Sequence, residues 1–336
     1  MRRHGFSLVL LCLLGGCISA PSRSVSKSGS RSPKGYHREI QVHSNGYIRY
    51  DGTDDIAGDL EFAARTFESD RYPTKVTLLP MIHMADESFY RSVENRIANA
   101  DCVITEGVHG KQEQLLSLGK ALGAIDIIRS RLDLVSQKEN FQQVRGIPYY
   151  WGDTVIGDFM PGMVANDVVP SVPPLFLVHG LAWIADFVFY GNGLFGRRKS
   201  DTIRHLVAQL MVAPQDYDDA ILTLLRRHRN GVSLPPKVLE AYRTELEVLA
   251  PSTLTSEYDV ILEQLALMHG ILICRNDRLF TEIEKRLADG NWNHIVIPWG
   301  AGHMWDIEER LADKLGYRLT TEEWLPAWKV QTRNGQ

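Results

Sequence analysis

Short apolar runs recur along this chain, and segments with helical periodicity follow them. Three of the runs are KVTLL (75–79), CVIT within DCVITEG, and HIVIP (294–298). Their length and β-branched residues are typical of buried strands, whereas ESFYRSVENRIANA and MWDIEERLADKLG have the spacing of amphipathic helices. Strands that alternate with helices usually pair as parallel neighbours. The sequence therefore predicts an α/β fold with a mixed, largely parallel sheet and helices on both faces.

The middle of the chain predicts helices rather than strands. Apolar residues from about 112 to 285 recur mostly at helical spacing, and GIPYYWG predicts one further short strand in this region. Near the amino end, HREIQVHSNGYIRYDG alternates apolar and polar residues around Asn45-Gly46, which predicts a hairpin with a two-residue turn at a sheet edge. We expect one domain over 37–330, with a mainly helical insert over about 160–285.

The amino terminus resembles the signal peptide of a bacterial lipoprotein. Arg2 and Arg3 precede an apolar run that is short for a membrane-spanning helix and ends in LLGGC, which is similar to a lipobox. The resemblance implies removal of residues 1–16 as a signal peptide and acylation of Cys17, for example with palmitate. Ordinary signal cleavage near Ala20 is the alternative.

The residues that follow indicate where an acylated chain would be held. Residue 18 is Ile18 rather than the aspartate that retains lipoproteins at the inner membrane, so the resemblance implies a lipid anchor in the cell envelope, at the outer membrane. Residues 17–36 are rich in serine and basic residues and have little to bury, which predicts a flexible tether. A formal net charge of -4 provides no basic footprint, so we expect no nucleic-acid partner.

Two features of the exported part leave alternatives open. Cys102 and Cys274 both lie in apolar sequence, and an exported protein permits a disulfide, so we expect either a bridge or two buried free thiols. PPLFLVHGLAWIADFVFYGNGLF (173–195) is the most apolar stretch after the signal peptide and contains His179 and Asp186. Its three interpretations are a buried helix hairpin or active-site cover, a surface that rests on a membrane or an apolar substrate, and a membrane span.

The strongest candidates for catalytic or metal-binding residues follow two predicted strands, and the two segments have the same order of features. KVTLLPMIHMAD and NHIVIPWGAGHMWD each pass from an apolar strand through a turn to His-Met and then to an acidic residue that can open a helix. His83 and His303 occupy the same place in the two segments, and Glu106 follows the strand in DCVITEG. Ligands of open α/β sheets bind outside the carboxyl ends of the strands, so we expect these three residues to converge there.

The sequence around His83, Glu106 and His303 also favours a functional site. Gly300 and Gly302 allow a sharp turn and leave the crevice free of side chains. A helix N-terminus after each histidine favours binding of an anionic ligand or an oxyanion. It also favours the neutral form of the imidazole, which a general base or a metal ligand requires. The structural alternatives are histidines that only pack after a strand, for His83 and His303, and a helix-capping or salt-bridged carboxylate, for Glu106.

Four other polar residues are weaker candidates. Arg275 can anchor a carboxylate such as Glu106, either as a structural pair or to bind substrate. Asp158 is expected to cap the helix that follows it rather than to join the site. His109 is a candidate because it closely follows Glu106, whereas His179, in an apolar segment, is expected to be a hydrogen-bonded core histidine.

The motifs of the chain resemble those of the TraB/PrgY/GumN family, which includes the Tiki metalloproteases and belongs with erythromycin esterase-like and ChaN-like proteins. GAGH (300–303) matches the late GxxH motif of the family, TEGV (105–108) resembles its glutamate segment, and CRNDRLFTEI resembles its Arg-Asn/Asp helix motif. PMIH (80–83) matches the early GxxH motif in its histidine but has Pro80 in place of the glycine, which would stiffen that turn. The sequence contains no HExxH, GxSxG, Walker or CxxC motif, so zincin, serine hydrolase and nucleotide-binding classes receive no support.

The resemblance implies a mixed sheet flanked by helices and hydrolysis of a peptide or ester bond. In the Tiki branch it implies a divalent metal, manganese or cobalt, near His83, Glu106 and His303, which would be ligands or proton-transfer groups for metal-activated water. In the esterase-like relatives it implies a histidine that activates water without a metal. The expected partner is a peptide or small-molecule substrate, and Arg275 joins the other three residues as a catalytic candidate.

The rival interpretation is a ligand-binding lipoprotein without catalysis. ChaN-like relatives are implicated in haem-iron binding, and the aromatic residues Trp183, Phe187 and Tyr190 could cover such a ligand. The sequence has no CxxCH motif, so the haem would be bound non-covalently. A third interpretation is an inactive family member that keeps the fold as an interaction module.

Overall fold

The computed structural model of the chain describes residues 38–42, 46–53, 57–107, 132–154, 218–227 and 269–330, and the single residues 129, 204, 205, 208, 211, 212, 229, 243, 244 and 248. Several predicted features lie outside them: the signal peptide, Cys17, the tether, His109, Asp158, His179 and the apolar stretch 173–195.

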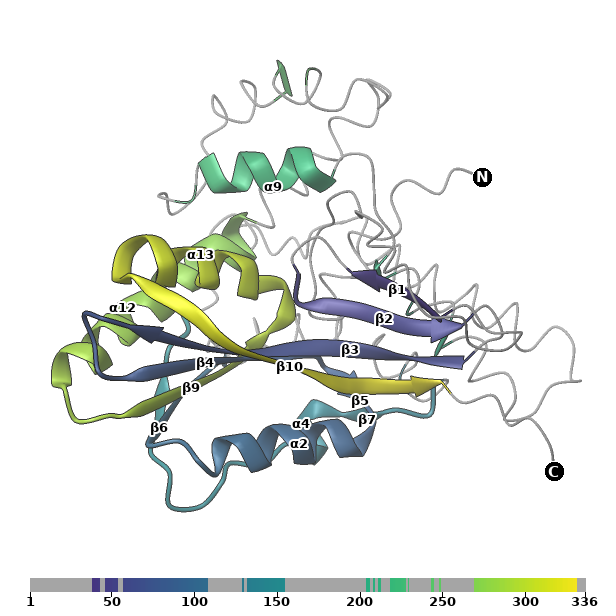
Figure 1. Cartoon of the computed structure of the whole chain (residues 1–336), viewed down its shortest axis with the longest axis horizontal. Helices are drawn as coiled ribbons and strands as arrows, with labels where there is room; N and C mark the ends of the chain where they lie inside the picture. The colour runs from purple at the N-terminus through teal and green to yellow at the C-terminus, as the bar shows by residue number, and fades with distance from the viewer. Residues whose placement is uncertain are drawn as a thin grey trace, which may run out of the picture.

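An eight-stranded mixed sheet forms the centre of the fold, as predicted (Figure 1). Its strands follow the order β1-β2-β3-β4-β9-β6-β8, and β10 pairs with β3 beside this path. The bounds are β1 Arg38–Val42, β2 Ile48–Thr53, β3 Ala57–Ser69, β4 Lys75–Met81, β6 Cys102–Thr105, β8 Tyr149–Trp151, β9 His294–Gly300 and β10 Tyr317–Val330. Within this order β4, β9, β6 and β8 are mutually parallel neighbours. The α/β fold with a mixed sheet is therefore confirmed.

The other half of the sheet is antiparallel and is built around the long strand β3. β2 pairs with its first part, β4 pairs with Arg65–Phe67, and β10 pairs with nearly its whole length. β1 and β2 form the predicted hairpin at the sheet edge. Val42 is opposite Arg49, which is the register that a two-residue turn at Asn45-Gly46 gives, and Gly46 has a positive φ of 70°. Residues 43–45 lie outside the described residues, so the turn itself stays a prediction.

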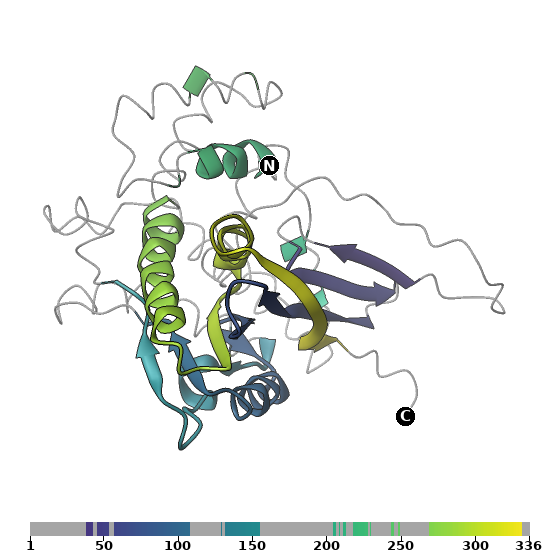
Figure 2. The ribbon, with the colours of Figure 1, turned by 60° about the vertical axis from the view of Figure 1, so that its left-hand side comes forward.

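Helices cover both faces of the sheet because successive strand residues point to opposite sides. In β4, Val76 and Leu78 join the hydrophobic cluster with the helices α12 (Arg275–Asp289) and α13 (Met304–Leu315). Leu79 and Met81 join the cluster on the other face, with α2 (Glu87–Ile97). Figures 1 and 2 show α12 and α13 on one side of the sheet and α2 on the other. Helices on both faces are therefore confirmed.

The remaining described elements are short or belong to the predicted insert. They are the strands β5 (Met84–Ala85) and β7 (Val135–Ser136), which pair with each other, the helix α4 (Gln137–Asn140), the helix α9 (Asp218–Arg227), a π-helical turn over His269–Cys274 and a 3-10 turn over Ala301–His303. The described residues between 204 and 285 are helical apart from residue 229, and the rest of the insert lies outside the described residues. No helix in the described part of the chain is long and apolar enough to cross a membrane.

No disulfide joins Cys102 and Cys274, the two cysteines within the described residues. Cys102 is buried in β6, and Cys274 is half-buried before α12. The alternative of a bridge between them is therefore wrong. Burial raises the pKa of Cys102 to about 12 and the pKa of Cys274 to about 11, so neither thiol is a ready nucleophile near neutral pH.

Candidate active site

The parallel strands bring the predicted residues to one edge of the sheet. β9 lies between β4 and β6, and Met81 at the end of β4 is in register with Gly300 at the end of β9. His83 and His303 follow these two ends, and Glu106 follows β6 directly. The sequence-based expectation that the three residues meet at the carboxyl ends of neighbouring strands therefore agrees with the topology.

Arg275, the first residue of α12, is the charged centre of this edge. Its Nη2 donates to Oε1 of Glu106 at 2.5 Å and to Oδ2 of Asp153 at 2.6 Å, and its Nε donates to Oδ1 of Asp153 at 2.8 Å. Arg275 is buried, Asp153 is completely buried, and the Glu106 side chain is 24% exposed. The predicted pairing of Arg275 with Glu106 is thus present, and Glu106 is the member of the group that solvent reaches.

Backbone N–H groups complete the binding of both carboxylates. Gly300 donates to Oε2 of Glu106 at 2.7 Å, and Gly107 donates to Oδ2 of Asp153 at 3.0 Å. A Cβ atom on Gly300 would lie 3.3 Å from Cδ2 of His303 and 3.4 Å from Oε2 of Glu106. Since Gly300 has an ordinary φ of -51°, the glycine is needed for space rather than for backbone conformation.

The charges within the group set the ionisation of Glu106 and Arg275. Burial alone would raise the pKa of Glu106, but the Arg275 guanidinium, His83 and the bond from Gly300 lower it, and its pKa lies below the usual value. Burial alone would lower the pKa of Arg275, but Glu106 and Asp153 raise it. Near neutral pH the edge therefore holds a glutamate carboxylate on a fixed guanidinium.

His303 is buried behind this ion pair rather than exposed at its mouth. Its Nδ1 lies 2.7 Å from Oδ1 of Asn276, and its Nε2 lies 3.4 Å from Nη1 of Arg275. The ring of Trp299 meets the imidazole edge-on, with 5.9 Å between the centroids. Burial and then the Arg275 guanidinium hold the pKa of His303 well below its usual value, so the imidazole is neutral, as predicted. The low pKa of His303 is caused by its burial and by the neighbouring Arg275 guanidinium, whereas the sequence-based prediction names a helix N-terminus.

His83, unlike His303, is exposed to solvent. Its backbone carbonyl oxygen accepts a hydrogen bond from the Gln137 N–H at 2.8 Å. Its positive form attracts the carboxylate of Glu106 and contributes to the low pKa of that group. Of the two predicted histidines, His83 is the one that solvent and a bound molecule can reach.

Pro80 lies inside the strand β4, not in the turn before His83 as expected. It is in register with Trp299 of β9, and the pairing of β4 with β3 ends at Leu78. The proline therefore replaces a strand residue at a position beyond the contact with β3, which is compatible with its missing N–H. The expectation that it stiffens the turn itself is wrong.

Two residues of the site were missed by sequence reasoning. Asp153 lies two residues after the end of β8, much as Glu106 lies directly after β6, so the rule that selected Glu106 could have found it. Asn276 appears in the sequence only as the second residue of the Arg-Asn pair in CRNDRLFTEI. Its contact with His303 depends on how α12 lies against α13, and no local pattern carries that information.

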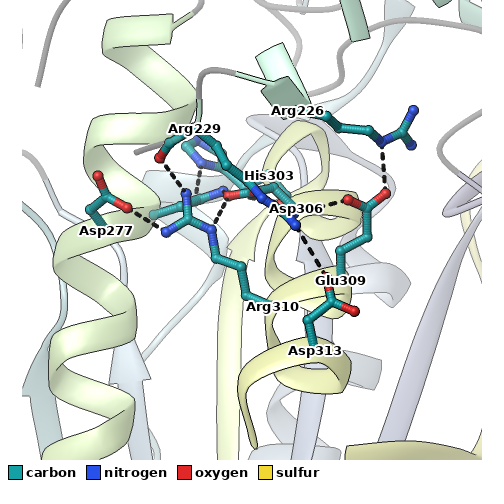
Figure 3. Close-up of polar contacts among 9 residues, drawn as sticks. Arg226, Arg229, Asp277, His303, Asp306, Glu309, Arg310 and Asp313 are labelled. Carbon is teal, nitrogen blue, oxygen red and sulfur yellow. Dashed lines mark hydrogen bonds and ion pairs between the residues drawn. The ribbon is translucent and has the colours of Figure 1, made fainter. Parts of the chain in front are cut away.

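A charged network continues from the site along α13. Asp306 accepts from Nδ2 of Asn276 at 2.9 Å and pairs with Nε of Arg310 at 2.8 Å. Figure 3 shows Arg310 between Asp306 and Asp277, which it also contacts. Arg229 lies across the same helix and binds Glu309 at 3.0 Å and Asp313 at 3.1 Å. The network fixes α13, whose first turn follows His303.

The donor atoms that a divalent metal would need are already engaged by Arg275. Oε1 of Glu106 and Nε2 of His303 both face its guanidinium, which would repel a dication placed between them. Within the described ranges, no group of three or more His, Cys, Asp and Glu side chains is placed to hold a metal ion. Glu106 and His303 in this arrangement do not fit a manganese or cobalt ion, and the metal stays a prediction for direct measurement.

Comparison of the chain with models of protein families, with curated proteins and with solved structures gave no match. The resemblance to the TraB/PrgY/GumN family therefore rests on the motifs alone.

Proposed function

We propose that the chain is a cell-envelope hydrolase that cleaves a peptide or ester bond with water activated by a histidine. The observation that carries the proposal is the solvent-reached carboxylate of Glu106, which is held on Arg275 and whose pKa the exposed His83 helps to lower. A base, a fixed carboxylate and a buried cation at the carboxyl ends of parallel strands are the parts that such a hydrolysis requires.

The roles follow from the environment of each residue. His83 takes the proton from the attacking water, because it is exposed and lies in the field of Glu106. Glu106 stabilises the imidazolium that forms, as a carboxylate does beside a catalytic histidine. Arg275 keeps Glu106 ionised and in place, and Asp153 in turn holds Arg275 through two hydrogen bonds. His83 then returns the proton to the leaving group.

The lipoprotein resemblance of the amino terminus supports a lipid anchor at Cys17 as part of this proposal. Labelling of growing cells with a palmitate analogue tests it. We expect label on the wild-type protein and none on Cys17→Ser. Label retained by Cys17→Ser, or absent from both proteins, would contradict the anchor and leave the hydrolase proposal untouched.

A cleavage assay with the full-length protein tests the hydrolase. A peptide library and a panel of simple esters would be incubated with wild type, His83→Gln and Glu87→Gln, with and without added manganese or cobalt. Removal of the base should lower the rate by about 10²–10⁴-fold. Glu87 is an exposed residue at the start of α2, near His83 in the chain, so its substitution is the matched surface control.

Two outcomes would overturn the proposal. Equal rates for wild type and His83→Gln would remove His83 from the chemistry. No cleavage by wild type, together with a Soret band on haem titration, would favour the ligand-binding lipoprotein instead.

A further inference from the structure

A buried chain of hydrogen bonds leads from Arg275 away from the substrate side. Nη1 of Arg275 lies 3.4 Å from Nε2 of His303, whose Nδ1 lies 2.7 Å from Oδ1 of Asn276. Nδ2 of Asn276 continues the chain to Oδ2 of Asp306 at 2.9 Å. Asn276 and Asp306 are completely buried, so water does not compete for these contacts.

The two ends of this chain each have one possible hydrogen-bonding role. A guanidinium group only donates, so Nε2 of His303 must accept from Arg275. The Asp306 carboxylate only accepts, because it is the ion-pair partner of Arg310, whose Nε lies 2.8 Å away. Arg229 faces the other carboxylate oxygen at 3.6 Å. Figure 3 shows these two arginines around Asp306.

The orientation of the Asn276 amide follows from its neighbours. One end of the amide faces two acceptors, the Asp306 carboxylate at 2.9 Å and the carbonyl oxygen of His303 at 3.3 Å. That end must therefore be the NH2 group, and the oxygen must face Nδ1 of His303. An oxygen only accepts, so Nδ1 carries the hydrogen. Arg275 and Asn276 thus require the same tautomer, and the backbone of Leu272 is a further polar neighbour that accepts from the ring.

We propose that Asp306 and Asn276 are positioning residues that hold His303 with its hydrogen on Nδ1, so that its Nε2 keeps the guanidinium of Arg275 turned toward Glu106. His303 then orients Arg275 and neither transfers a proton nor binds a metal, which leaves proton transfer to His83. The inference rests on the proposed function for its role in a reaction, but the tautomer itself exists in the resting protein.

The tautomer can be read directly in the full-length protein. Long-range ¹H–¹⁵N spectra of protein labelled with ¹⁵N-histidine distinguish a ring nitrogen that carries hydrogen from one that does not, and His303→Gln identifies the signals of this ring. In wild type we expect the Nδ1–H form alone. In Asp306→Asn either end of the new amide can face Asn276, so the Asn276 amide is no longer fixed in one orientation. We therefore expect a mixture of the Nδ1–H and Nε2–H forms of His303.

Two further variants separate positioning from general damage. Asp277→Asn removes a carboxylate that also contacts Arg310 but does not touch Asn276, so it should leave the Nδ1–H form alone. The double variant Asn276→Asp with Asp306→Asn exchanges the two groups. Its residue 276 can only accept from Nδ1, and we expect the Nδ1–H form to return. In the cleavage assay, Asp306→Asn should lower kcat on the order of a hundredfold, and the exchange should recover part of it.

The outcomes distinguish this inference from the proposed function. An Nε2–H form in wild type, or an unmixed Nδ1–H form in a folded Asp306→Asn, would overturn the positioning role whatever the activity. If Asp306→Asn does not fold, the wild-type spectrum and the exchange variant still decide the matter. The expected tautomers without any hydrolysis would support the positioning role and contradict the hydrolase.

Discussion

Nη2 of Arg275 lies 2.5 Å from Oε1 of Glu106, although 169 residues separate the two in the chain. The same guanidinium makes two hydrogen bonds to the completely buried Asp153. One cation therefore pairs with two carboxylates that follow neighbouring strands. Removal of the cation leaves the completely buried carboxylate of Asp153 without its partner, which is among the most costly defects that a single substitution creates.

We predict that Arg275→Met destabilises the protein by about 3–5 kcal/mol, the range found when one partner of a buried ion pair is removed. Arg275→Lys should lie between this variant and wild type, because a lysine keeps the charge but cannot make the two-atom contact with Asp153. Urea unfolding measures the effect. Arg318→Gln breaks an exposed pair with Asp70 and is the control, with almost unchanged stability expected. Equal stability for Arg275→Met and wild type would contradict the assigned burial.

His303 should make the stability of the protein fall as the pH drops below about 6.5, the ordinary histidine pKa. Its pKa in the folded protein is well below that value, so at mildly acidic pH the unfolded chain binds a proton that the folded chain does not. The stabilising difference is complete above the unfolded pKa and shrinks as the pH falls toward the folded one. His303→Gln should lack this slope. Unfolding free energies measured between pH 5 and 8 check it, and parallel curves for the two proteins would refute it.

Glu106 should add a second, more acidic region of pH dependence. Its pKa is lowered in the folded state, so it contributes stability above the ordinary glutamate pKa of about 4.3, and this contribution is lost as the pH falls through the lowered value. Glu106→Gln should flatten the acid side of the stability curve below that pH and leave the slope of His303 in place. Unfolding measured from pH 5 downward tests this, and a slope that survives in Glu106→Gln would assign it to other carboxylates.

Metal analysis of the purified full-length protein addresses the manganese or cobalt prediction. Because Arg275 engages the donor atoms of Glu106 and His303, we expect no stoichiometric divalent metal and no loss of activity with a chelator. His303→Ala should have the same metal content as wild type. A stoichiometric metal that His303→Ala loses would show that the site rearranges around an ion, and the metal-dependent mechanism would then replace the one proposed above.

Local pattern was sufficient for the strands and helices that position the site. β4, β6 and β9 are short apolar runs, and α2 has Phe89, Val93 and Ile97 buried on one side, as its spacing predicts. β3 and β10 have no such pattern. β3 buries the consecutive residues Phe62, Ala63 and Ala64 in the two opposite clusters, so its apolar residues do not alternate simply with polar ones.

The composition of β10 does not predict a strand. It contains Glu322 and Glu323, which point to an exposed segment, and Pro326, which normally argues against a strand in a sheet. The proline is accommodated at an irregularity in the pairing with β3, between Pro326 and Trp328. Such an irregularity is set by the partner strand, and the sequence of β10 alone does not contain it.

The site shows the same division between local and long-range information. Placement after parallel strands was enough to find His83, Glu106 and His303, and it could have found Asp153. It was not enough to separate the exposed His83 from the buried His303, since both follow the same motif. That difference comes from α12, which brings Arg275 and Asn276 against His303 from a distant part of the chain.

The position of β9 between β4 and β6 has a consequence for how the protein is made. β9 is synthesised after both of its neighbours, because it follows β4 and β6 in the chain. A nascent chain that ends before residue 294 contains the segments of β4 and β6 but not the strand that joins them. Neither the edge that carries Glu106 nor the contact with His303 exists until the carboxyl-terminal segment is present. A fragment that ends before residue 294 therefore lacks the strand that brings the residues of the candidate site together.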